Sequence, residues 1–314
     1  MKMSNVRSAL DSPAAKLGAY AVLLAVALGG GAVAGATIGP EASTIVDGMD
    51  GSTDGPSVVE QMPPGLAVSQ DGYILDLRTP LLDAGRPGEL GLTITGPDGR
   101  PVTDYAVEHD KELHLIVVGR DLADYAHVHP TRDDDGVWTV AAPPLMPGSY
   151  RVFADFTPTG GDALTLGADL VVPGDHQPVA LPAASATSTI DDFEVSFDGE
   201  LVGGTESELT VLVARNGQPV TDLQPYLDAF GHLVAIRSGD LAYLHVHPLD
   251  EAAGAGGPSV RFAVEVPTSG TYRLFFDFSH GDQVRTAAIT AVAATAAERP
   301  DDDEPSNDHD THGD

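Results

Sequence analysis

The chain has 314 residues, a net charge of −31 and no cysteine. Its length allows roughly two domains of about 150 residues each. The acidic charge disfavours nucleic acid as a partner, and the absence of cysteine excludes disulfides, thiolate zinc sites, iron–sulfur clusters and His/Cys blue-copper centres.

The N-terminal sequence predicts export. Residues 1–16 form a basic segment that we expect to lie in the cytoplasm, and an uncharged run follows at residues 17–39. This run is long enough to cross a bilayer as a transmembrane anchor, and the positive charge before it places the rest of the chain outside the cytoplasm. The alternative is a cleaved signal peptide, because small residues at 32–36 fit a cleavage site. We therefore expect a protein of the cell membrane with an extracytoplasmic bulk, or a secreted protein if the segment is cleaved.

Composition divides the remainder of the chain. Residues 40–64 are rich in Gly, Ser, Asp and Pro and predict a flexible linker. Two repeats follow at residues 65–173 and 190–295, separated by a proline-interrupted linker at residues 174–189. Residues 296–314 predict a disordered acidic tail, whose His and Asp residues resemble a weak metal-scavenging tract.

Both repeats show short alternating strands between Gly, Pro and Asp turns. In the first repeat the pattern predicts strands at 72–77, 89–95, 113–118, 125–129, 136–142, 149–156 and 163–172. In the second it predicts strands at 193–197, 208–214, 232–236, 243–247, 260–266, 271–278 and 284–292. About seven short strands per 100 residues is typical of an immunoglobulin-like sandwich, and Tyr150 and Tyr272 resemble the tyrosine corner of that fold. The expected fold class is all-β, with two tandem immunoglobulin-like β-sandwich domains after an N-terminal transmembrane or signal helix.

A histidine pattern occurs in both repeats at an offset of 118 residues. His114, His127 and His129 correspond to His232, His245 and His247. Imidazole is the commonest protein ligand for zinc and copper, so a duplicated histidine frame indicates a metal site. Because side chains alternate along a strand, His127 and His129 share one face. A symmetric hairpin would then place His114 opposite His129 and Ile116 opposite His127.

The presumed strand F adds a carboxylate on the same face in each repeat, Asp155 in the first and Asp277 in the second. These patterns predict two Cu(II) or Zn(II) sites, one per repeat. The predicted ligands are His114, His129 and Asp155, and His232, His247 and Asp277, with His127 and His245 as supporting or alternative ligands. The alternative is that the histidines only form structural hydrogen bonds. His109 aligns with Leu227 and is expected at the surface, and His176 is expected in the linker.

The same outward sheet face is apolar. It carries Ile116, Val118, Tyr125 and Phe153 in the first repeat and Val234, Ile236, Tyr243 and Phe275 in the second. Contiguous exposed apolar area usually marks a contact surface. We therefore expect the two repeats to pack through these sheets, or to bind a partner there.

Residues 114–118 (HLIVV), 127–130 (HVHP) and 148–155 (GSYRVFAD) resemble exported bacterial immunoglobulin-like proteins, of cupredoxin-like or copper-carrier-like type, that accompany heavy-metal handling. The resemblance implies a metal-related role. The chain lacks the methionine clusters that suit Cu(I), which favours Cu(II) or Zn(II). We expect a divalent-metal-binding protein that is not an enzyme. The alternative is a cell-envelope module that binds a protein partner and keeps its histidines for structure.

Overall fold

The computed structural model describes residues 62–250, 252 and 256–296. The predicted transmembrane or signal segment at 17–39 and almost all of the predicted linker at 40–64 and tail at 296–314 lie outside these residues. The described residues contain strands and no α-helix, so none of them forms a segment suited to crossing a bilayer as a helix. Both sandwiches belong to one compact unit, residues 60–314.

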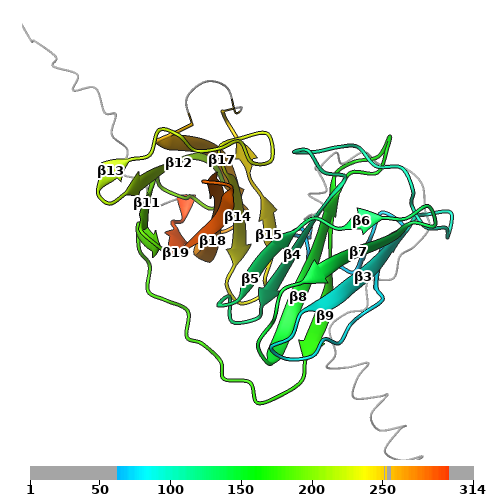
Figure 1. The fold of residues 1–314 in the computed structure, drawn as a ribbon. Helices are drawn as coiled ribbons and strands as arrows, with labels where there is room; N and C mark the ends of the chain where they lie inside the picture. The colour runs from blue at the N-terminus through cyan, green and yellow to red at the C-terminus, as the bar shows by residue number, and fades with distance from the viewer. Residues whose placement is uncertain (1–61, 251, 253–255, 297–314) are drawn as a thin grey trace, which may run out of the picture. The chain divides into compact units, whose positions relative to one another are not determined.

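The first repeat consists of two facing sheets (Figure 1). One sheet has the order β1-β2-β3-β7-β6 and the other the order β5-β4-β8-β9. The strands are β1 Ser69–Gln70, β2 Tyr73–Leu77, β3 Gly88–Thr95, β4 Leu113–Gly119, β5 Tyr125–Val128, β6 Thr131–Arg132, β7 Val137–Ala142, β8 Gly148–Phe156 and β9 Leu164–Val172. All seven predicted strands are present, with ends shifted by a residue at most.

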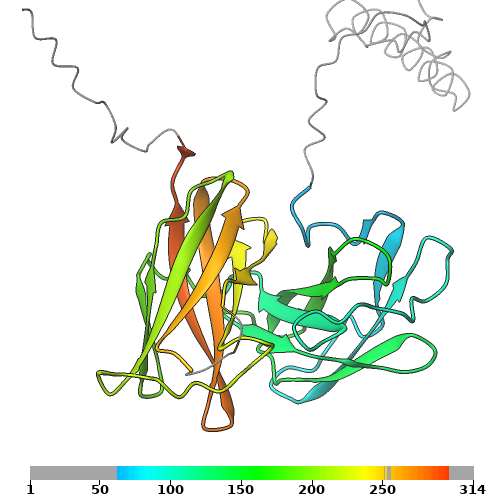
Figure 2. The ribbon, with the colours of Figure 1, turned by 90° about the horizontal axis from the view of Figure 1, so that it is seen from above.

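The second repeat has the same architecture, and its long strands are seen from the side in Figure 2. Its sheets have the orders β10-β11-β12-β17-β16, with β13 paired to β12, and β15-β14-β18-β19. The strands are β10 Thr187–Ile190, β11 Phe193–Asp198, β12 Thr205–Arg215, β13 Gln218–Pro219, β14 His232–Arg237, β15 Tyr243–His245, β16 His247–Pro248, β17 Ser259–Val266, β18 Gly270–His280 and β19 Gln283–Ala293.

The strand order identifies the sandwich type. Read as A, B, E and D, the strands β2, β3, β7 and β6 form one sheet, and β5, β4, β8 and β9 form the second sheet as C′, C, F and G. This is the immunoglobulin arrangement, and β11, β12, β17, β16 and β15, β14, β18, β19 repeat it. The predicted fold of the two repeats is therefore confirmed.

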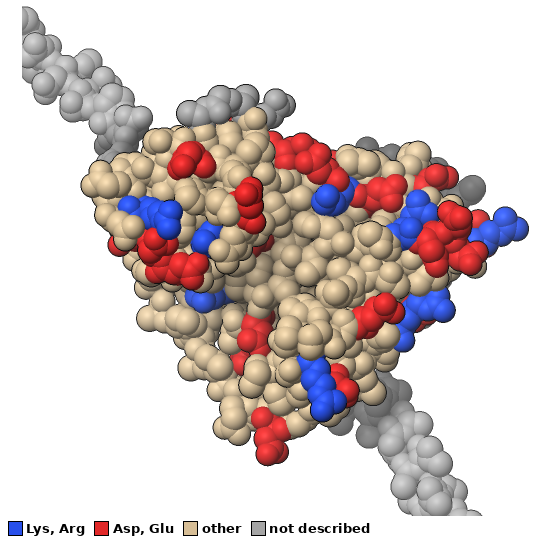
Figure 3. Space-filling model, viewed as in Figure 1, with Lys and Arg blue, Asp and Glu red and all other residues tan. Residues whose placement is uncertain are grey.

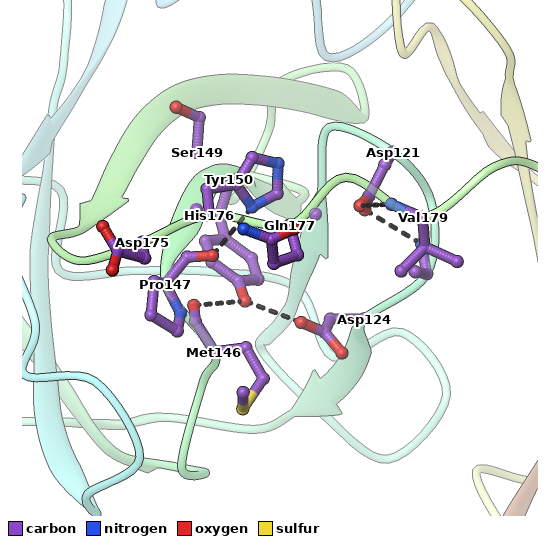
Figure 4. A pocket seen from close by; sticks show the side chains of 13 residues that line it. Asp121, Asp124, Met146, Pro147, Ser149, Tyr150, Asp175, His176, Gln177 and Val179 are labelled. Carbon is purple, nitrogen blue, oxygen red and sulfur yellow. Dashed lines mark hydrogen bonds between the residues drawn. The ribbon is translucent and has the colours of Figure 1, made fainter.

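The tyrosine corners form as predicted. The hydroxyl of Tyr150 donates to the carbonyl of Met146 at 2.8 Å and to Asp124 at 2.7 Å (Figure 4). In the second repeat the hydroxyl of Tyr272 donates to the carbonyl of Thr268, also at 2.8 Å. Each hydroxyl reaches back four residues, which fastens the start of strand F to the loop before it.

Each sandwich has its own apolar core, and a third cluster joins the two repeats. Strand β4 is buried at every position, although one face of a strand in a two-layer sandwich normally meets water. Leu115 and Val117 point into the first core, while Ile116 and Val118 belong to the third cluster. That cluster also contains Leu122, Phe153, Val234, Ile236, Leu241, Tyr243 and Phe275, all at most 3% exposed. The prediction that the repeats pack through their apolar sheet faces is confirmed.

The inter-repeat connection is more ordered than a simple linker. Strand β10 begins within the predicted linker 174–189 and pairs with β11 along its whole length. Leu181 packs against the third cluster. The Ser and Thr side chains in residues 185–189 suit an edge strand with one solvated face. The proline-rich sequence just before them made this strand difficult to predict.

Charged side chains are paired locally on the surface. On the face in Figure 3, the basic patches are separate and lie beside acidic ones. Among the ion pairs of the described residues, Arg261 lies 2.7 Å from Asp250 and 3.5 Å from Glu208. Positive charge on that face is thus dispersed among carboxylates.

Candidate metal centre

Strand register brings the histidines of the first repeat together. On β4, His114 pairs with Asp155 of β8, and Ile116 pairs with His127 of β5. His129 follows the end of β5 by one residue. These pairings are the ones that side-chain alternation predicts, and they direct all three imidazoles away from the core of their own sandwich.

Three imidazole nitrogens converge at this point. The Nδ1 of His114 lies 3.1 Å from the Nε2 of His127 and 3.3 Å from the Nε2 of His129. All three candidate ligand atoms lie within 4.8 Å of one another. His114 is buried and His129 is half-buried, while the imidazole of His127 is almost completely buried although the residue as a whole is partly exposed.

The partners of the remaining nitrogens define the tautomers. The Nε2 of His114 lies 3.0 Å from the carbonyl oxygen of Glu108. A carbonyl only accepts, so this nitrogen donates its proton, and the Nδ1 of His114 faces the other two rings. A backbone carbonyl that fixes a histidine in this way is a common companion of a metal-binding imidazole.

His127 is held in the same manner by the second repeat. Its Nδ1 donates to Oδ2 of Asp277 at 3.0 Å, and both side chains are only 2% exposed. The Nε2 of His127 is thereby directed at the Nδ1 of His114. The hydroxyls of Tyr125 and Thr286 also donate to Asp277, to Oδ2 and Oδ1 respectively. A carboxylate with three donors is firmly oriented, and so is the imidazole that it holds.

Two further histidine rings complete the cluster. The ring of His232, from the second repeat, stacks on His114 with centroids 5.6 Å apart and lies 4.7 Å from His127. The ring of His109 lies 6.1 Å from His114 and 6.0 Å from His232. A second group of three candidate ligand atoms comes from His127, His232 and Asp277. The cluster therefore draws on both repeats.

Burial shifts the protonation equilibria at the cluster. Desolvation, followed by the neighbouring His127 and His114, lowers the pKa of His129 to about 3. Desolvation and then the charge of Asp277 raise the pKa of Tyr125 well above its ordinary value. Desolvation and Asp155 do the same to the pKa of Tyr243. His129 is thus neutral near pH 7, the state in which an imidazole can bind a metal.

The observed cluster differs from the predicted site in the first repeat in two ways. Asp155 is in neither group of candidate ligands; it accepts hydrogen bonds from Thr165 at 3.1 Å and from Tyr243 of the second repeat at 3.2 Å. His127, expected to be a supporting residue, is the one histidine that the two groups share. The expected role of Asp155 did not take account of the tyrosine that the other repeat places beside it.

The predicted site in the second repeat is rearranged more strongly. His232 pairs with Asp277 and Val234 with His245, as expected. His247, however, is exposed and lies on β16, which pairs with β17 in the opposite sheet. The expected cross-strand pair of His232 and His247 is therefore wrong. The chain changes sheets at Val246, whose side chain is 1% exposed, and this resets the alternation on which the prediction relied.

Two other histidines were predicted outside the site. His109 was expected at the surface but is half-buried beside His114 and His232, and alignment of the repeats could not reveal it because Leu227 occupies the equivalent position. His176 lies in the connection between the repeats, as expected. It borders a small cavity of about 200 Å³ at the tyrosine corner, where its Nδ1 donates to the carbonyl of Pro147 (Figure 4).

Comparison with solved structures returns distant matches. The Escherichia coli adhesin FdeC is 16% identical, with coverage of 73% of this chain and 66% of that one and a TM-score of 0.25. Salmonella alpha-2-macroglobulin is 14% identical, with coverage of 75% and 16% and a TM-score of 0.26. The Ig1-2 module of Drosophila receptor protein tyrosine phosphatase DLAR is 10% identical, with coverage of 71% and 98% and a TM-score of 0.20. The chain thus spans 66% of the adhesin and 16% of the macroglobulin.

Sequence comparison gives one family. No match to the chain was found among curated proteins. The profile described as "Domain of unknown function (DUF8832)" matches residues 67–173 and, again, residues 188–295. The two matches coincide with the two sandwiches.

Proposed function

The chain belongs to the DUF8832 family through both of its sandwiches, and we propose that it binds a divalent transition-metal ion, Cu(II) or Zn(II), at the histidine cluster. One observation carries this proposal. The Nδ1 of His114 and the Nε2 of His127 and His129 converge, while His114 and His127 each use their other nitrogen to donate to a fixed acceptor. Three imidazoles in this arrangement are a ligand set with its orienting groups already in place.

The spacing of the nitrogens suits coordination. Ligand atoms about 2.0–2.1 Å from a tetrahedral zinc ion lie roughly 3.3 Å from one another. The separations of 3.1 and 3.3 Å in the cluster match this edge length.

The donor type favours particular ions. Neutral imidazoles suit Zn(II) and Cu(II), whereas Cu(I) prefers thiolate and thioether sulfur. The chain has no cysteine, and its five methionines form no cluster in the sequence. Three protein nitrogens leave a fourth position, which His232 of the neighbouring group is close enough to approach.

The biological role that follows is metal handling outside the cytoplasm, as a carrier, a buffer or a resistance protein, and binding rather than catalysis. The location rests on the basic, apolar and acidic order of the N-terminal sequence, as an anchor or as a signal peptide. The resemblance to exported proteins of heavy-metal handling supports the role. The alternative, a cell-envelope interaction module with structural histidines, would have to bind its partner through another surface, because the apolar sheet faces are buried between the repeats.

Calorimetric titration of the full chain with Zn(II) and Cu(II) tests the proposal. The protein carries His309→Ala and His312→Ala, so that the tail contributes no imidazole. Binding should weaken at least 100-fold in His127→Ala and remain unchanged in His176→Ala, a matched histidine outside the cluster. Binding no tighter than millimolar, or equal losses in the two variants, would refute the site.

A further inference from the structure

The ligands and the group that orients them belong to different repeats. His114, His127 and His129 come from the first repeat, whereas Asp277, which holds the Nδ1 of His127, comes from β18 of the second. His232, whose ring stacks on His114, also comes from the second repeat. Separation of the repeats would leave His127 without its carboxylate and expose the cluster on one side.

The contact between the repeats around the histidine cluster is apolar and almost completely shielded from solvent. Tyr125 of the first repeat stacks on Phe275 of the second with ring centroids 4.0 Å apart, and Phe153 meets Tyr243 at 5.3 Å. Tyr125 donates to Asp277 and Tyr243 donates to Asp155, so each repeat offers a tyrosine to a carboxylate of the other. The carboxylate that orients His127 is therefore in place only when the two sheet faces are in contact.

We propose, on the basis of the function proposed above, that metal binding and docking of the two repeats are coupled. The first repeat supplies the ligands, and the second supplies the carboxylate that fixes His127. The ion then binds tightly only to the docked pair and stabilises docking in return, because coupling between two equilibria is reciprocal. The second repeat thus regulates metal affinity from within the chain.

The first test measures metal affinity in the full chain with the silenced tail. Asp277→Asn removes the carboxylate, and loss of such an orienting group typically weakens metal binding by roughly 10–100-fold. Asp250→Asn is the matched control, because it makes the same change in the second repeat at a carboxylate that is bonded to Arg261 and belongs to neither group of candidate ligands. Its affinity should stay within about threefold of the wild type.

The second test weakens the apolar contact between the repeats without altering any residue of the histidine cluster. Ile236→Ser places a hydroxyl in the apolar contact and should also lower metal affinity, by roughly tenfold or more. Spin labels at Leu81→Cys and Val292→Cys, both at exposed sites in a chain without cysteine, report the distance between the repeats. Added metal should narrow that distance distribution, and Asp277→Asn should abolish the narrowing. If Ile236→Ser does not fold, Leu241→Ser provides the same test.

The outcomes separate the two proposals. If the wild type binds no metal, the proposed function fails and the coupling fails with it. If the wild type binds metal through His127 but Asp277→Asn and Ile236→Ser bind equally well, the metal site stands and the coupling is wrong. If the wild type binds metal tightly but added metal leaves the distance distribution between the spin labels unchanged, the coupling alone is overturned.

Discussion

The Nδ1 of His127 in the first repeat lies 3.0 Å from Oδ2 of Asp277 in the second. The two residues are 150 positions apart in the chain. Both side chains lie at the contact between the repeats and are only 2% exposed. This bond connects the candidate ligands to the packing of the tandem. It makes the candidate metal centre a property of two domains together.

Metal should stabilise the folded chain. An ion present at 100 times its dissociation constant adds about 2.7 kcal/mol to the free energy of unfolding if it binds only the folded state. Thermal denaturation with and without Zn(II) measures this gain, and a chelator should reverse it. His127→Ala should show no gain; a gain equal to that of the wild type would place the bound ion elsewhere.

The contact between the repeats should contribute strongly to stability. Phe275→Ala removes the ring that stacks on Tyr125 and leaves a cavity, which costs about 3–5 kcal/mol for a buried phenylalanine. Val292→Ala on the adjacent strand is the control, since its side chain is exposed and its loss should change the free energy of unfolding by about 0.5 kcal/mol or less. Urea denaturation compares them, and similar midpoints would mean that the sheet face of Phe275 is not buried in solution.

The tyrosine corner of the second repeat should support the fold and leave the metal site unaffected. Tyr272→Phe removes the hydrogen bond to the carbonyl of Thr268, at a cost of about 0.5–1.5 kcal/mol. Urea denaturation measures the cost, while calorimetry should give the wild-type metal affinity. A loss of affinity without a loss of stability would contradict this separation.

Stability should depend on pH through Asp240. Hydrogen bonds from the Arg237 guanidinium hold the pKa of Asp240 below its usual value of 3.8. Because the folded-state pKa is the lower one, the contribution is complete above the unfolded pKa and is lost as pH falls through the folded pKa. The pair is partly exposed, so its contribution is about 1 kcal/mol or less. Wild type and Asp240→Asn should therefore differ at pH 6 and converge as the pH falls below the ordinary pKa of 3.8; a constant difference would contradict this origin.

Local pattern was sufficient to predict each sandwich. Alternating apolar residues, Gly and Asp turns and the positions of Tyr150 and Tyr272 depend on contacts within one repeat, so the strand bounds and tyrosine corners followed from sequence. The face carrying Ile116 and Val234 was also predictable, because an apolar stripe on a strand's outer side requires a cover. Register then gave the proximity of His114 to both His129 and Asp155.

The composition of the site could not be predicted in the same way. Whether Asp277 contacts a histidine of its own repeat or of the other repeat depends on how the two sheets pack. The alternation of side chains along one strand contains no information about that packing. The alternation of histidine and valine also continues through His245, Val246 and His247, although the chain moves to the opposite sheet there. The sequence pattern therefore gave no sign that His247 lies in a different sheet from His232. His109 sits in a loop with a positive φ of 48°, outside any periodic segment.

X-ray absorption spectroscopy of the zinc-loaded full chain with His309→Ala and His312→Ala shows directly which atoms bind the ion. At least three imidazole nitrogens are expected at about 2.0–2.1 Å from the zinc, with loss of one imidazole in His127→Ala. Coordination by oxygen alone, or an identical spectrum from His127→Ala, would contradict this expectation.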